Sequence, residues 1–296
     1  TEIAKLRLFL KMVAVVEVDK RADNLGLDPL PDIDFNIRCG NTLVGYATEA
    51  ELNNDLTWGD MFANAEFKEK VESEMQLVSM AYDTFKYVQL NQGEDMVAFK
   101  QAKGELKQRL ASLNETLNRR MHASTHLNYE DWLKSHQPFH WLAEFYQIIK
   151  GNGGFDVIIG NPPYVEYSKI RKIYIIQNYQ TLYSGNLYSY VIERSFKIIK
   201  NHNYIGMIIP ISAFCTARME CLMNVFYQNS TKTFISNFAE RPSKLFEGAE
   251  RNLSIVIAKI ERLYKCKELY TTYYYKWKSE NRNQVFNSIS YYNATN

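Results

Sequence analysis

Apolar residues recur at helical spacing in two long stretches of the chain. They lie three or four positions apart at Val71, Met75, Val78, Tyr82 and Phe85, and again at Leu106, Leu110, Leu113, Leu117 and Met121. This spacing places each set on one face of an amphipathic helix, where packing is its ordinary role. With a turn at Asn91-Gln92-Gly93 between the two stretches, the pattern predicts a helical hairpin within an insertion spanning residues 48–150.

After Gly154 the pattern changes to short apolar runs rich in β-branched residues. Four such runs predict strands, at 155–160, 204–210, 233–238 and 253–260, with the first two expected to be buried. Two longer segments between them predict helices, at 186–200 and 212–227. This alternation favours an α/β fold with an open, mostly parallel sheet and helices on its faces.

The first part of the chain has a different pattern. Residues 2–17 are apolar nearly all round, which predicts a buried helix. Gly26, Pro29 and Pro31 predict a loop, and residues 35–39 predict a short strand that ends at Gly40-Asn41. Residues 270–292 are rich in Tyr and Asn and predict no single class of element.

Composition narrows the class of protein. The chain has 296 residues, of which 46% are hydrophobic and 23% charged, so global disorder is excluded. No apolar run of about 18 residues is present, so we predict no membrane span. The four cysteines form no CxxC pair, and the His pairs at four-residue spacing have no further ligand nearby. We therefore expect free thiols in a reducing cytoplasm, with no metal site.

The net charge of +2 hides an asymmetry along the chain. Residues 1–160 carry 17 Lys and Arg against 24 Asp and Glu, whereas residues 161–296 carry 18 against 9. A basic half indicates either a polyanionic partner such as nucleic acid or an ordinary solvated surface. The cluster Lys169-Arg171-Lys172 leaves the same two alternatives open, phosphate binding or a solvated face.

The strongest chemical signal is the sequence Asn161-Pro162-Pro163-Tyr164, directly after the predicted strand at 155–160. In open α/β sheets, ligands bind at the carboxyl ends of strands. Prolines disfavour helix and leave carbonyl groups without a helical partner. We expect a rigid corner where the Asn161 side-chain oxygen and the Pro162 carbonyl accept hydrogen bonds from a planar amine, while Tyr164 stacks on its ring.

This motif resembles the catalytic motif of S-adenosylmethionine-dependent amino-methyltransferases. The wider pattern resembles the N6-adenine DNA methyltransferases, specifically the type IIG restriction–modification group. Four further segments carry that resemblance in the same order along the chain: EIAKLRLFL, DIDFNIRCGNTLVG, GMIIPISAF and LFEGAERNLSIVIAKI. Together the similar segments cover residues 1–45 and 150–262.

The resemblance implies a Rossmann-like methyltransferase sheet, S-adenosylmethionine as cofactor and double-stranded DNA as partner. Asn161, Pro162, Pro163 and Tyr164 would then form the catalytic motif on a flipped adenine, with Phe246 on the other side of the base. Such an enzyme must extrude the base, because N6 is inaccessible in the stack. The resemblance further implies that Gly40 and Asn41 lie near the cofactor, and from the basic cluster we expect Lys169 and Arg171 to hold DNA.

The resemblance also predicts the organisation of the chain. Residues 1–47 and 151–269 would form the methyltransferase core, interrupted by the insertion at 48–150, and 270–296 would begin a target-recognition region. The glycine-rich cofactor loop and the acidic residue of the family's first strands are absent from this sequence. We therefore expect the first strands, and the rest of the recognition domain, to belong to a longer bacterial polypeptide that acts on the nucleoid.

Two other functions remain open from the residues. The same four-residue motif occurs in methyltransferases that modify a glutamine side-chain amide of a protein, where the acceptor amine is again planar. Alternatively, the chain is an inactive scaffold, because the cofactor loop is missing. The basic half of the chain and the late-motif resemblance favour DNA as the substrate.

Overall fold

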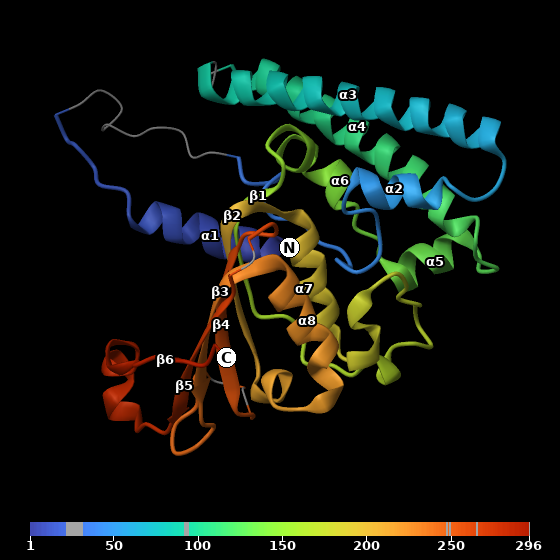
Figure 1. The fold of residues 1–296 in the computed structure, drawn as a ribbon. Helices are drawn as coiled ribbons and strands as arrows, with labels where there is room; N and C mark the ends of the chain where they lie inside the picture. The colour runs from blue at the N-terminus through green and yellow to red at the C-terminus, as the bar shows by residue number, and fades with distance from the viewer. Residues whose placement is uncertain (22–31, 92–94, 247, 249, 265, 296) are drawn as a thin grey trace. The chain divides into compact units, whose positions relative to one another are not determined.

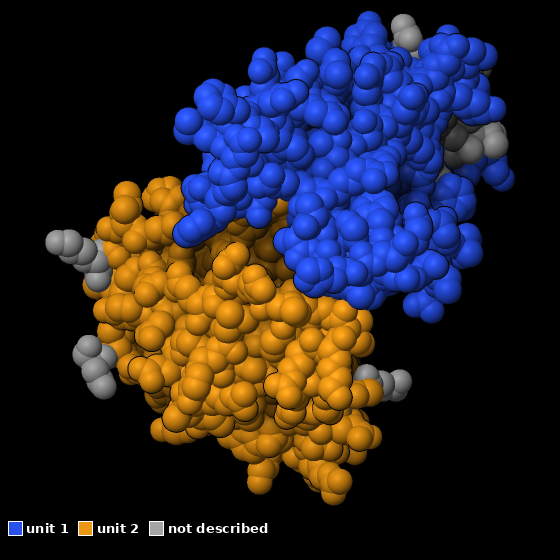
Figure 2. Space-filling model, turned by 90° about the vertical axis from the view of Figure 1, so that its right-hand side faces the viewer, with its two compact units in different colours: residues 1–41, 52–146 blue, residues 42–51, 147–296 orange. Residues whose placement is uncertain are grey.

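The computed structural model describes residues 1–21, 32–91, 95–246, 248, 250–264 and 266–295 (Figure 1). The described residues divide into two compact units, 1–41 with 52–146 and 42–51 with 147–296, which are coloured separately in Figure 2. The predicted loop at Gly26, Pro29 and Pro31 lies outside the described residues, as do Gln92 and Gly93 of the predicted turn. The predicted domain boundaries remain a prediction.

The first unit is helical. It contains α1 (Glu2–Ala14), α3 (Met61–Asn91), α4 (Met96–His122), α5 (Tyr129–His136), α6 (Trp141–Glu144) and the end of α2 (Glu49–Asp55). The predicted hairpin is formed by α3 and α4, which lie side by side in Figure 1. Their facing stripes are buried, with Leu106, Leu113 and Leu117 fully enclosed. The Asp95 side chain begins α4 by accepting from the backbone N–H groups of Val97 and Ala98.

Two predictions for the first unit are wrong. Residues 35–39 form a turn followed by irregular backbone, not a strand. The backbone N–H of Asn36 donates to Ile33 O, and Phe35 packs edge-on against Phe85. This segment is held by side chains on helices, so no sheet partner is needed. The helix α1 is present, but none of its residues is buried, and Ile3 is 71% exposed. An apolar helix is buried only where another element of the fold covers it, and the sequence of the helix alone does not show this.

The second unit is built on a six-stranded sheet with the order β1-β2-β4-β3-β5-β6. The strands are β1 (Phe155–Gly160), β2 (Ile199–Pro210), β3 (Ser230–Phe238), β4 (Leu253–Ile260), β5 (Glu268–Tyr275) and β6 (Tyr292–Asn293). The α/β class is confirmed, but the sheet is mixed instead of mostly parallel. Among the described strands, β1–β2 and β3–β5 pair in parallel, whereas β4 is antiparallel to both β2 and β3. In the described part of the connection 239–252 there is no helix, and β4 pairs antiparallel with β3.

The core of the second unit lies between the sheet and its helices. Figure 1 shows α7 (Leu187–Ile198) and α8 (Glu220–Asn229) on one side of the sheet. Their apolar faces pack with Ile205, Met207 and Ile209 of β2 in one buried cluster. The predicted helix at 212–227 is interrupted: 3₁₀ turns at Ile211–Phe214 and Ala217–Met219 precede α8 because Thr216 takes an extended backbone conformation.

The sheet also has a less covered end. The predicted strand at 155–160 is confirmed as β1, but Val157 and Ile159 are 58% and 80% exposed, so it is not buried. The reason is its place at the end of the strand order. On the interior strand β3, Trp277 and Val285 pack on Phe238. Short turns complete the unit at Gln147–Gly151, Tyr167–Lys169, Gln180–Ser184, Ser279–Gln284 and Phe286–Ser288. Among the described residues, no helix has both the length and the apolar character to cross a membrane.

The entry into β1 depends on Gly154. Its φ is +123°, and a Cβ atom there would lie 2.5 Å from the carbonyl oxygen of Ile198. We expect Gly154→Ala to lower the free energy of unfolding by roughly 1–3 kcal/mol, through backbone strain and this clash. The control is Gly104→Ala in α4, where a Cβ would meet nothing within 4 Å and should raise stability slightly. Urea unfolding of both variants tests this, and equal effects would contradict it.

Candidate active site

The motif Asn161-Pro162-Pro163-Tyr164 forms the loop that leaves the carboxyl end of β1. The last residue of β1, Gly160, pairs with Met207 of β2, so the loop starts from a strand held in the sheet. Beyond the motif the chain is fixed to the start of α7, because the N–H of Leu187 donates to Val165 O at 2.9 Å. The motif is therefore a non-helical corner held at both ends, as its two prolines predict.

A second loop, 239–252, meets the motif at the same end of the sheet. Strand β3 runs in the direction of β1, because β1 and β2 are parallel and both β2 and β3 are antiparallel to β4. The loops that follow β1 and β3 therefore leave the sheet at the same edge. Its end is fixed by Asn252, whose backbone oxygen accepts from Ile211 N and whose Oδ1 accepts from Glu240 N.

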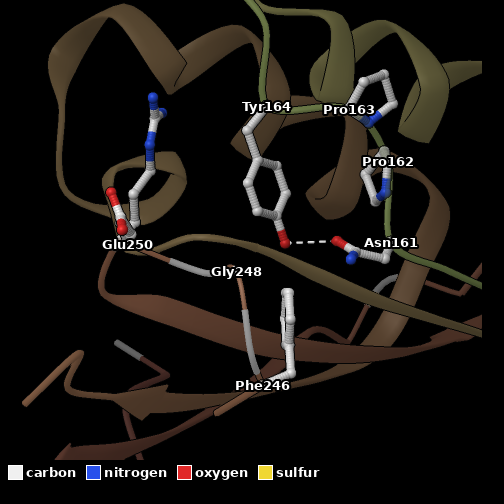
Figure 3. A pocket seen from close by; sticks show the side chains of 8 residues that line it. Asn161, Pro162, Pro163, Tyr164, Phe246, Gly248 and Glu250 are labelled. Carbon is white, nitrogen blue, oxygen red and sulfur yellow. Dashed lines mark hydrogen bonds between the residues drawn. The ribbon is translucent and has the colours of Figure 1, made fainter. Parts of the chain in front are cut away.

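These loops line an open pocket of about 390 Å³ (Figure 3). Its lining combines the complete motif with residues of the second loop: Asn161, Pro162, Pro163, Tyr164, Phe246, Gly248, Glu250 and Arg251. Figure 3 shows the Phe246 ring directed towards the contact between Asn161 and Tyr164. The structure thus brings the four predicted catalytic residues together with Phe246, although 82 positions of sequence separate Tyr164 from Phe246.

The Tyr164 side chain is held in this pocket by its hydroxyl group. Its hydroxyl lies 2.6 Å from Asn161 Oδ1 and 2.9 Å from the backbone oxygen of Ile208 in β2. A phenol has one proton, so it donates to one of these acceptors at a time. Burial raises the pKa of Tyr164 to about 12, against the opposing effect of the Arg251 charge. The hydroxyl is therefore a neutral hydrogen-bond donor at physiological pH.

The remaining predicted residues lie elsewhere. Lys169 and Arg171 are exposed on the turn that follows the motif and do not line the pocket. Gly40 and Asn41 belong to the helical unit. There the position of a Gly40 Cβ is occupied by Phe139, at 2.8 Å, and Asn41 N donates to Gln137 O. The glycine thus has a packing reason of its own, and the DNA and cofactor roles of these four residues remain predictions.

Sequence reasoning missed the other residues of the second loop. Gly248, Glu250 and Arg251 line the pocket; they lie in the segment LFEGAERNLSIVIAKI that carries the resemblance, but only Phe246 of that segment was assigned a role. Their signal is proximity in sequence to Phe246, just before the strand at 253–260. Ile208 contributes only its backbone oxygen, which every residue type has, so its role could not be predicted from the sequence. Among the described residues, no group of three or more His, Cys, Asp or Glu is arranged to bind a metal ion.

One protein family matches most of the chain. Residues 1–246 match the family described as Eco57I restriction-modification methylase. The chain belongs to this family. The resemblance read from the motif series is thereby confirmed at the level of restriction–modification methyltransferases.

Individual relatives extend the comparison. A curated protein of Methanocaldococcus jannaschii, a putative type II restriction enzyme and methyltransferase, is 27% identical over 298 residues. The match covers 86% of this chain and 24% of that protein, so the chain spans about a quarter of the length of this relative. Two solved structures are similar at lower identity. One is a nuclease-deletion mutant of the Type ISP enzyme LlaGI with a DNA substrate mimic, at 12% identity and a TM-score of 0.40, covering 68% of this chain and 22% of that one. The other is the DrdV–DNA complex, at 11% identity and a TM-score of 0.41, covering 64% and 25%.

Proposed function

We propose that this member of the Eco57I family contains the catalytic residues of a DNA methyltransferase specific for the N6 amino group of adenine. The methyl donor would be S-adenosylmethionine, and the enzyme would serve a cytoplasmic restriction–modification or phage-defence system. One observation carries the proposal: the amide of Asn161, the two prolines, Tyr164 and Phe246 line a single pocket. This combination offers hydrogen-bond acceptors for an amine together with aromatic rings for a base.

The residues of the pocket would act by orientation. Asn161 Oδ1 and the Pro162 carbonyl would accept the two N–H groups of the target amine, which directs the nitrogen lone pair towards the methyl group. Tyr164 and Phe246 would flank the base. Extruding an adenine from the duplex costs a few kcal/mol, and stacking on aromatic side chains returns about 1–3 kcal/mol per base. The rings would thus offset most of the cost of base flipping.

Tyr164 would change its hydrogen bond when the base enters. In the structure its hydroxyl contacts Asn161 Oδ1, the atom that we assign to the amine, and also Ile208 O. Donation to Ile208 O leaves Oδ1 available for the substrate. Because the hydroxyl keeps its proton at physiological pH, this exchange requires no ionisation of Tyr164.

The chemistry of the lining residues fits a pre-activated methyl donor. S-adenosylmethionine supplies, when bound, a methyl group that is attached to a positively charged sulfur. Transfer from such a donor needs an oriented nucleophile, and the pocket provides acceptors and rings for that orientation. We retain Gly40 and Asn41 as the residues of this chain that would lie near the cofactor.

The proposal is tested with the full-length polypeptide and radiolabelled S-adenosylmethionine. Unmethylated genomic DNA and a proteome extract serve as parallel acceptors. Label in DNA supports the proposal. Label only in protein would support the glutamine-amide alternative, and cofactor binding without any transfer would contradict both enzymatic functions under these conditions.

The aromatic contact of Tyr164 can be separated from its hydroxyl. We expect Tyr164→Ala to raise KM for DNA about 5- to 150-fold, the equivalent of losing 1–3 kcal/mol of stacking. Tyr164→Phe keeps the ring and should retain most of the affinity. Steady-state kinetics on both variants checks the expectation, and an equal loss in the two variants would show that the ring does not stack on the substrate.

A further inference from the structure

We propose that Arg251 binds a backbone phosphate of the nucleotide whose base enters the pocket. This inference rests on the proposed function and adds to it a residue that distinguishes a nucleotide from a protein side chain. Arg251 lines the pocket together with Asn161 and Tyr164, although it lies on the loop that precedes β4.

No carboxylate of the described residues pairs with Arg251, and its side chain is exposed. Its charge acts on the pocket, because it lowers the pKa of Tyr164 and of Tyr188 against the larger effect of burial. Because Arg251 lines the pocket, its guanidinium can reach an anion at the mouth of that pocket.

The neighbouring acidic residue has a different partner. Glu250 also lines the pocket, but its carboxylate pairs with Lys244 Nζ at 3.7 Å. In the described part of the second loop, this pairing leaves Arg251 as the uncompensated charge that lines the pocket. The local balance therefore favours an anionic group of the ligand beside Arg251.

The backbone beside Arg251 is well fixed. The next residue, Asn252, accepts hydrogen bonds from Ile211 and from Glu240, and Leu253 is buried at the start of β4. Leu253 pairs with Pro210 on one side and with Phe238 on the other. Arg251 therefore projects from a position that the sheet holds, which is suitable for a directional contact.

The geometry of a guanidinium suits a phosphodiester. Its planar donors match two phosphate oxygens, and it remains protonated throughout the physiological range. A flipped nucleotide brings the phosphates on either side of its sugar to the mouth of the pocket that holds its base. A glutamine side chain brings no such anion. Arg251 would thus favour DNA over the protein substrate that the amine-binding motif alone also accepts.

The test uses the full-length protein with a duplex that contains its methylation site. We expect Arg251→Ala to raise both KM and Kd for DNA by about 10- to 150-fold, the range for a charge-assisted hydrogen bond of 1.5–3 kcal/mol. The slope of log Kd against log salt concentration should fall by about 1, which is the change expected for the loss of one phosphate contact. Arg251→Lys should restore part of the affinity. The matched control is Arg241→Ala, on the same loop but outside the pocket lining, which should change Kd far less.

A neutral methylphosphonate next to the target adenine separates this contact from a general charge effect. On that duplex, the wild-type protein should lose as much affinity as Arg251→Ala loses on the natural duplex, and the variant should lose little more. Transfer to DNA with Arg251→Ala indistinguishable from Arg241→Ala would overturn the inference while leaving the proposed function intact. Absence of any transfer to DNA by the unaltered protein would instead contradict the proposed function. Unchanged thermal unfolding of the variants excludes a folding defect.

Discussion

Replacing Asn161 with alanine is expected to lower kcat for methyl transfer by roughly 100- to 1000-fold, the usual effect of removing one preorganised hydrogen-bonding group from an active site. Asn161 lines the pocket, and its Oδ1 is the side-chain acceptor that we assign to the amine. Without it the Pro162 carbonyl alone would orient the nitrogen. Single-turnover measurements with saturating DNA report this step directly.

The controls for this variant address orientation and folding. Asn161→Asp keeps an oxygen acceptor at the same distance from the backbone, so it should retain more activity than the alanine variant. Asn203→Ala, in the part of β2 away from the pocket, should behave as wild type. Because Asn161 is exposed, its removal should leave the unfolding transition unchanged. A kcat near the wild-type value in Asn161→Ala would contradict the catalytic role of this residue.

Among the charged residues, we expect replacement of Arg194 to lower the stability of the fold most. Its side chain on α7 is 5% exposed, pairs with Glu51 and donates to the backbone oxygen of Gly45 at 3.3 Å. Lys197 pairs with the same carboxylate at 2.9 Å. These contacts attach residues 42–51 to α7 within the second unit. We expect Arg194→Ala to lower the free energy of unfolding by about 3–5 kcal/mol, because a partly buried carboxylate would lose its main partner.

This contribution should depend on pH. Burial raises the pKa of Glu51, but the charges of Arg194 and Lys197 outweigh it, so the pKa in the folded protein lies below its ordinary value. A carboxyl with a lowered folded-state pKa stabilises the fold above its unfolded pKa, and this stability is lost as pH falls through the folded-state value. The difference in unfolding free energy between wild type and Arg194→Ala should therefore shrink on acidification below about pH 4.5. A difference that stays constant would contradict the role of the Glu51 charge.

Elements with a strong local pattern were predictable. The stripes of α3 and α4 and the apolar runs of β2, β3 and β4 each follow one period, and each was found. The predictions that failed concern features that are decided by contacts with other elements of the fold. The order of strands places β4 between β2 and β3, and no local pattern encodes that. The exposure of α1 and the turn and irregular backbone at 35–39 likewise depend on what covers each segment, or on which side chains hold it.

The site divides in the same way. Asn161 and Tyr164 were predicted because two prolines after a strand are a local and chemically specific signal. Phe246 was predicted through the resemblance, and the structure brings it to the pocket. Arg251 was missed because its proximity to Tyr164 arises from the common direction of β1 and β3, which only the sheet topology shows.

The central claim concerns the atom that receives the methyl group, so the most direct measurement is mass spectrometry of nucleosides from DNA treated with the full-length protein and S-adenosylmethionine. The account predicts N6-methyldeoxyadenosine, formed by the wild-type protein and formed far more slowly by Asn161→Ala. Methylation found only on cytosine, or only on protein glutamine, would contradict the assignment of the pocket to a flipped adenine.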